Sequence, residues 1–220
     1  MFDGWYTDAA LTDKVTTVKL NGNTTIYAKW AKNPDTGLPF TDVRSGDWFY
    51  DDAVYAFEKG LMNGTGSTTF SPNLITTRGM IVTILYRMEN SPAVTGSNPF
   101  NDVADGRWYT DAITWAAANN IVSGYGEGKF GPNDSISREQ MASILYRFAA
   151  YKGYDVAKSA DLAGYTDAES ISDYALLPMQ WANAEGLITG TAATTLDPAG
   201  HATRAQVAAI IHRFCENVVG

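Results

Sequence analysis

The chain has 220 residues, 45% of them apolar, with a formal net charge of −8 and a pI near 4.7. It contains no run rich in lysine and arginine, which argues against DNA or RNA as a partner, and no apolar run long enough to insert into a membrane. The N-terminus lacks a basic start followed by an apolar stretch, so we expect an internal piece of a larger protein. The single cysteine, Cys215, excludes an internal disulfide framework.

Residues 1–33 differ in composition from the rest of the chain. Thr, Val and Tyr alternate along residues 15–20 and 24–30 on either side of the turn signal Asn21-Gly22-Asn23, which predicts a short β-hairpin. The run FDGWYTDAALTDKV…TTIYAKW resembles the end of a Listeria–Bacteroides repeat, a small β module of bacterial surface proteins. We therefore assign residues 1–33 to a partial repeat of this type and residues 34–39 to a linker.

A unit then recurs three times, at residues 40–92, 98–152 and 163–220. Sixty positions separate matching residues of the first two copies, such as Arg78 and Arg138, and sixty-six positions lead on to Arg204. A unit of this size is marginal alone, so we expect the three copies to share one core.

Each copy contains two predicted helices joined by a glycine-rich turn. The first helix follows the aromatic residue at Trp48, Trp108 or Tyr174. The second follows an N-cap residue, which is Thr77, Ser137 or Thr203. Apolar residues then stand 3, 6, 7 and 10 positions after each arginine and form one stripe at helical period. Three such stripes predict a mainly α pseudo-threefold assembly around a central three-helix bundle.

The unit FxDV…WYxDAIxWA…IVSGYGxGxFGPNxxISREQMAxILYRF resembles the S-layer homology module. This resemblance implies a non-catalytic module that attaches an exported protein to a secondary cell-wall polysaccharide, often one whose terminal N-acetylmannosamine carries a pyruvate ketal. It also implies an extracellular location, at the wall or surface layer of a Gram-positive bacterium, with other surface-layer proteins as further candidate partners. The family's Thr-Arg-Ala-Glu hallmark keeps its arginine in all three copies and loses its glutamate in all three.

The helix-start arginines Arg78, Arg138 and Arg204 are the main candidate site residues. A cation in the first turn of a helix is mildly unfavourable, so an anion is expected nearby. One hypothesis is a ligand carboxylate bound by the guanidinium group and by free helix amides. The other is an ion pair with Asp42, Asp102 or Asp167 of a neighbouring copy. The resemblance favours the ligand.

The other candidates each have two interpretations. The aromatic residues Trp48, Trp108 and Tyr174 either line a sugar site or pack in the core. The turn residues offer backbone N–H groups to sugar hydroxyls, and the candidates are Gly64, Gly124, Tyr125, Gly126 and Gly190. For Gly64, Gly124 and Gly190 a helix C-cap role is favoured.

Several further residues are expected to be structural. Tyr55, Trp115 and Trp181 are predicted core residues, and the second arginines Arg87, Arg147 and Arg213 suit helix C-termini. The third copy has Tyr174 in place of tryptophan and Leu196 in place of Phe70 and Phe130, so its groove is expected to be weaker or altered.

The sequence offers little for catalysis. His201 and His212 are the only histidines, His212 and Cys215 alone do not make a zinc site, and no calcium loop is present, so no enzyme activity, metal or cofactor is predicted. We expect up to three carbohydrate sites, each where one copy's glycine turn and aromatic residue meet an arginine of the same or an adjacent copy. The alternative is a protein-interaction or S-layer self-assembly scaffold that binds no glycan.

Overall fold

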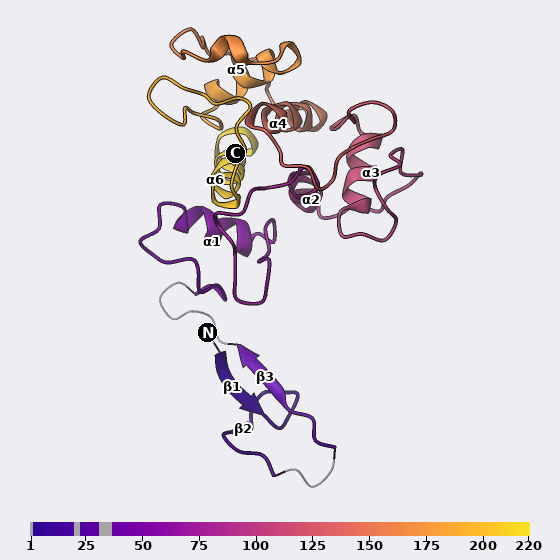
Figure 1. The fold of residues 1–220 in the computed structure, drawn as a ribbon, viewed down its shortest axis with the longest axis vertical. Helices are drawn as coiled ribbons and strands as arrows, with labels where there is room; N and C mark the ends of the chain where they lie inside the picture. Colours follow the sequence, from indigo (N-terminus) through magenta and orange to yellow (C-terminus); the bar gives the residue numbers. More distant parts are fainter. Residues whose placement is uncertain (1, 20–22, 31–36) are drawn as a thin grey trace.

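The computed structural model describes residues 2–19, 23–30 and 37–220. The described chain is mainly helical, with a small antiparallel sheet at its N-terminal end (Figure 1). The predicted mainly α fold class, with β structure at the N-terminus, is therefore confirmed.

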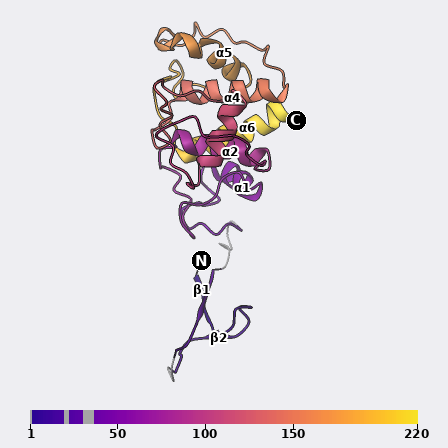
Figure 2. The ribbon, with the colours of Figure 1, turned by 90° about the vertical axis from the view of Figure 1, so that its right-hand side faces the viewer.

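The sheet contains β1 (Phe2–Tyr6), β2 (Lys14–Val15) and β3 (Tyr27–Trp30) in the order β2-β1-β3. The expected β structure is present, but the predicted pairing of residues 15–20 with 24–30 is wrong. Both outer strands pair with β1 instead, because residues 2–6 supply a third strand between them. Asn21 and Gly22 of the predicted turn and residues 34–36 of the linker lie outside the described residues. Figures 1 and 2 show the sheet projecting from the helical body.

Each copy of the repeat folds into two helices. Copy 1 contains α1 (Tyr50–Glu58) and α2 (Arg78–Met88), and copy 2 contains α3 (Thr110–Ala118) and α4 (Arg138–Lys152). Copy 3 contains α5 (Leu176–Ala184) and α6 (Arg204–Phe214). Two short 3-10 turns, Ala168–Ser170 and Asp173–Ala175, precede α5, and a π turn, Cys215–Val219, follows α6.

The second helix of each copy begins where the sequence predicts. Thr77, Ser137 and Thr203 have extended backbones, and each side chain accepts a hydrogen bond from the amide three residues later. The apolar stripe that follows is buried in all three helices, with only Met88 partly exposed. The Phe148 and Phe214 rings, 5.8 Å apart, bring α4 and α6 together within one continuous core.

The copies interlock in a cyclic order. The first helix of each copy packs on the second helix of the preceding copy: α3 on α2, α5 on α4, and α1 on α6. Figure 1 accordingly shows α2, α4 and α6 at the centre, with α1, α3 and α5 outside them. Single β-bridges ahead of the central helices follow the same order, namely Thr77 with Ser135, Ser137 with His201, and Thr203 with Ile75. This order supports the pseudo-threefold symmetry, which stays a prediction.

Candidate functional site

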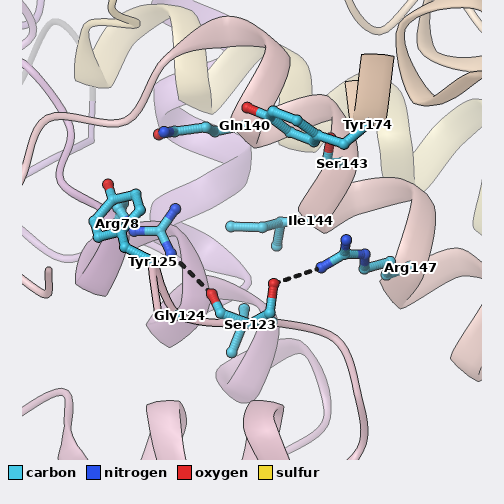
Figure 3. A pocket seen from close by; sticks show the side chains of 10 residues that line it. Arg78, Ser123, Gly124, Tyr125, Gln140, Ser143, Ile144, Arg147 and Tyr174 are labelled. Carbon is cyan, nitrogen blue, oxygen red and sulfur yellow. Dashed lines mark hydrogen bonds between the residues drawn. The ribbon is translucent and has the colours of Figure 1, made fainter. Parts of the chain in front are cut away.

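Three grooves lie between the copies, and each contains residues from all three. One copy contributes its helix-start arginine, the next its glycine turn and second helix, and the remaining copy its exposed aromatic residue. Groove 1 is lined by Arg78, Gly124, Tyr125, Gln140, Arg147 and Tyr174 (Figure 3). Groove 2 is lined by Arg138, Gly190, Thr191, Gln206, Arg213 and Trp48. Groove 3 is lined by Arg204, Gly64, Thr65, Met80, Arg87 and Trp108.

This arrangement corrects one expectation about how the sites are composed. The turn and the aromatic residue of one copy were expected in the same groove, but Gly124 lies in groove 1 and Trp108 in groove 3. They separate because the aromatic residue precedes the first helix of its copy, and that helix packs on the preceding copy. The glycine turn instead lies beside the second helix of its own copy.

The helix-start arginines are buried and reach into the next copy. Arg78 Nε donates to the Phe130 carbonyl at 2.9 Å, and its Nη2 donates to the Ser123 carbonyl at 3.2 Å (Figure 3). Arg138 bonds the Leu196 and Thr189 carbonyls in the same way, and Arg204 bonds those of Phe70 and Asn63. The three residues are only 5–6% exposed. Burial lowers the pKa of each guanidinium group, which nevertheless stays charged.

One terminal nitrogen of each of these arginines is left over. Nη1 of Arg78, Arg138 and Arg204 has no hydrogen-bond partner among the described residues. In Figure 3, the Arg78 guanidinium points toward the space beside Gln140 and Ile144. Each groove therefore contains a desolvated guanidinium group whose Nη1 can still donate hydrogen bonds to a ligand.

The ion-pair hypothesis for these arginines is wrong. Within residues 2–19, 23–30 and 37–220, none of the three makes a salt bridge. Asp102 instead accepts hydrogen bonds from the backbone amides of Phe130 and Gly131 in its own copy. Asp102 and Arg78 thus hold the N–H and the carbonyl of the same residue, Phe130. Asp42 and Asp167 do likewise in their copies.

The expectation of free helix amides is also wrong. The amides of Arg78 and Gly79 donate to the Asp134 and Pro132 carbonyls of copy 2, and the third amide donates to its N-cap side chain. The same bonds recur at the starts of α4 and α6. A ligand in these grooves must therefore rely chiefly on side chains.

The second arginines, expected to be structural, also line the grooves. Arg87 Nη1 donates to the Leu61 carbonyl at 3.1 Å, and Arg147 Nη1 donates to the Ser123 hydroxyl at 3.2 Å. Six of the eight arginines in the chain thus line the three grooves, two in each. Among the described residues that line them there is no aspartate or glutamate, although the chain has 24 such residues. The grooves are cationic recesses in an acidic protein.

The aromatic candidates lie at the surface rather than in the core. Trp48, Trp108 and Tyr174 are 67%, 56% and 52% exposed. The Tyr174 hydroxyl donates to Glu139 at 3.1 Å, and burial together with the Glu139 charge raises the pKa of Tyr174 to about 12. The predicted core residues behave as expected, since Trp115 and Trp181 are buried and Tyr55 packs half-buried against the core.

The glycines of the turns are not helix C-caps. The first helices are capped at Lys59, Asn119 and Glu185, several residues earlier. A Cβ atom at Gly124 would lie 2.2 Å from the Lys129 carbonyl oxygen and 2.9 Å from the Phe100 ring. Gly64 and Gly190 have similarly close neighbours. Glycine stands there because the turn folds tightly on itself.

Beyond Gly124, the turn of copy 2 differs from the other two turns. Tyr125 is exposed, and its ring lies over the Arg78 guanidinium at 4.5 Å. Gly126 adopts φ of 98° and is not among the residues that line groove 1.

Sequence reasoning missed two glutamines. The Gln140 side chain accepts a hydrogen bond from the Ser137 amide, and Gln206 does the same for Thr203, completing two capping boxes. Each glutamine occupies the position of the lost glutamate, completes the cap and also lines a groove. The spacing from Ser137 and Thr203 to a glutamine three residues later was the available signal.

Two residues at which copy 3 differs from the other copies, Tyr174 and Leu196, lie at different grooves. Tyr174 lines groove 1, whereas Leu196 accepts the hydrogen bond from Arg138, which lines groove 2. Arg204 and Arg78 lie over the rings of Phe70 and Phe130, and Leu196 offers Arg138 no ring. The expectation of one altered third groove is therefore wrong, because no groove belongs to a single copy.

His212 and Cys215 lie at the contact between α6 and α1. His212 Nδ1 lies 2.8 Å from Asp52, and its ring stacks on Tyr55 at 4.0 Å. Burial raises the pKa of the Cys215 thiol, which disfavours its reactive thiolate. Among the described residues, no three His, Cys, Asp or Glu side chains are grouped to hold a metal ion.

Three interlocked two-helix repeats around a shared core, with three grooves that each combine arginines and an exposed aromatic residue, define a tandem-repeat module. The S-layer homology domain model matches residues 39–79, 99–142 and 164–208, and the chain belongs to this family. It is thereby a cell-surface anchoring module. No helix in the described part of the chain is long and apolar enough to cross a membrane.

The chain is similar to short parts of much longer proteins. It is 33% identical over 179 residues to an amylopullulanase of Thermoanaerobacterium thermosulfurigenes, covering 80% of this chain and 9% of that protein. It is 31% identical over 180 residues to an endoglucanase of Bacillus sp. (strain KSM-635), covering 82% and 19%. It is 28% identical over 182 residues to an S-layer protein of Bacillus thuringiensis subsp. finitimus, covering 80% and 21%.

Proposed function

We propose that this module anchors its parent protein by binding a secondary cell-wall polysaccharide in the three grooves, without catalysis. The observation that carries the proposal is the pairing of two arginines with an exposed aromatic residue in every groove, with no acidic residue among the described residues that line it. This donor set suits an acidic sugar, because a planar guanidinium group binds a carboxylate through two parallel hydrogen bonds.

Two features of the ligand, its carboxylate and its sugar ring, bind different residues of the groove. The free Nη1 of the buried arginine and the guanidinium of the second arginine bind the carboxylate. The exposed aromatic face packs on the apolar side of the sugar ring. A terminal N-acetylmannosamine with a pyruvate ketal carries both features and is our candidate. Three weak sites on one chain give strong retention on a repeating wall polymer through avidity.

The buried arginines are poor targets for testing this proposal, because they also join the copies. The test uses the second arginines, with Arg87→Gln, Arg147→Gln and Arg213→Gln combined in one chain. The matched control combines Arg44→Gln and Arg107→Gln, which remove exposed arginines outside the grooves.

Binding is measured by co-sedimentation with purified wall sacculi, with and without removal of polysaccharide by hydrofluoric acid. We expect the wild-type and control chains to sediment with intact sacculi only, and the groove variant to stay in solution. Equal binding of the wild-type chain to stripped sacculi would contradict glycan anchoring. Undiminished binding by a folded groove variant would contradict the assignment of the grooves as the sites. No binding of the folded wild-type chain to either preparation would favour the self-assembly scaffold.

A further inference from the structure

The three grooves differ at one position of the second helix. Gln140 lines groove 1 and Gln206 lines groove 2, whereas the equivalent residue in groove 3 is Met80. All three follow their N-cap by three positions, so their side chains leave the helix at the same place. The chemistry at this point therefore changes from an amide to a thioether.

The capping box fixes how each glutamine presents its amide. Oε1 of Gln206 accepts the hydrogen bond from the Thr203 amide at 2.9 Å, and Oε1 of Gln140 accepts that from Ser137 at 3.2 Å. With its oxygen held in this way, each side chain retains an Nε2 group with two hydrogens. Neither Nε2 has a hydrogen-bond partner in the described part of the chain. Grooves 1 and 2 thus contain a pre-positioned neutral donor.

Groove 3 has fewer free donors. Met80 contributes only a weak acceptor sulfur. In addition, Arg87 Nη1 is already bonded to the Leu61 carbonyl, and no such bond to described residues is present for Arg213 of groove 2. Grooves 2 and 3 each have a buried arginine, a threonine on the turn and an exposed tryptophan. They also differ beside the buried arginine, where groove 2 has Leu196 and groove 3 has the Phe70 ring.

We propose that Gln140 and Gln206 are specificity-determining residues that donate a hydrogen bond to an oxygen acceptor of the bound acidic sugar, and that groove 3 is the weak site because of Met80. This inference rests on the proposed function. One hydrogen bond to a charged acceptor is worth about tenfold in affinity, so groove 2 should bind the sugar about tenfold more tightly than groove 3.

Grooves 2 and 3 can be observed separately in one protein. Trp48 lies in groove 2 and Trp108 in groove 3, so the indole N–H signals of a ¹⁵N-labelled chain report the two sites during one titration. The probe is the methyl glycoside of N-acetylmannosamine with a pyruvate ketal, and the ketal-free glycoside is the control. We expect the Trp48 signal to shift at about tenfold lower probe concentration than the Trp108 signal.

Reciprocal variants test the assigned residues. Met80→Gln should tighten the Trp108 response about tenfold and leave the Trp48 response unchanged, and Gln206→Met should weaken only the Trp48 response. Because Met80→Gln predicts a gain, loss of folding cannot mimic it. Equal responses in the wild type, or no gain with Met80→Gln, would overturn the inference while leaving anchoring intact. No indole shift with the probe, together with no binding to intact sacculi, would instead overturn the proposed function.

Discussion

Replacing Arg204 with methionine tests whether the helix-start arginines stabilise the packing of the three copies against one another. Arg204 joins copy 3 to copy 1, donating from Nε to the Phe70 carbonyl at 2.8 Å and from Nη2 to the Asn63 carbonyl at 2.6 Å. Arg204→Met keeps an unbranched stem of similar length and removes both donors. The change therefore isolates the hydrogen bonds and the cation, which lies 4.7 Å from the Phe70 ring.

The expected loss follows from the groups left unpaired. Orphaning the buried Phe70 carbonyl costs about 1–3 kcal/mol, and orphaning the part-buried Asn63 carbonyl costs less. Removing a desolvated cation returns part of that cost. We therefore expect unfolding free energy to fall by about 2–4 kcal/mol, out of the roughly 5–15 kcal/mol typical of a domain. For a body of this size, that corresponds to a melting temperature lower by about 5–15 °C.

Urea and thermal unfolding followed by circular dichroism measure this loss. The matched control is Arg213→Met, on the same helix and without a hydrogen bond to the described residues, which should stay within about 0.5 kcal/mol of the wild type. If Arg204→Met changes stability no more than this control, the carbonyl bonds do not hold the copies together and the reasoning is refuted.

Three further predictions concern stability. Gly124→Ala should destabilise by about 3 kcal/mol in urea unfolding, because the new Cβ would lie 2.2 Å from the Lys129 carbonyl oxygen, whereas Gly46→Ala, with open space around it, should be neutral within about 0.5 kcal/mol. Thr76→Val should raise the melting temperature, since the buried Thr76 hydroxyl lacks a partner among the described residues and its removal relieves about 1 kcal/mol; a lower melting temperature would indicate a hidden partner. Hydrogen bonds from backbone amides lower the pKa of Asp167, so its stabilisation is present above the unfolded pKa of about 4 and is lost as pH falls through the folded value. The Asp167→Asn variant should therefore lose less unfolding free energy than the wild type as the pH is lowered. An equal loss in the two proteins would contradict this.

The sequence alone predicted the local structure well. Thr77, Ser137 and Thr203 indicated the helix starts, because a side-chain cap and the residues that follow it are neighbours along the chain. The apolar stripe gave the buried face of each second helix for the same reason. By contrast, the pairing of the N-terminal strands was predicted wrongly. The alternation of residue types indicates a strand but not its partner, and both β2 and β3 pair with β1.

Thus the sequence by itself determined the number of repeats, the position of the second helices and the residue types of the candidate sites. Only the tertiary structure decided which copy completes which groove. Arg78, for example, binds the carbonyl of a residue 52 positions away, and Arg204 binds one 134 positions away. Every residue carries a carbonyl, so such an acceptor leaves no mark in the sequence. The cyclic packing of the helices selects it, and that packing also brings the three helix-start arginines to the grooves.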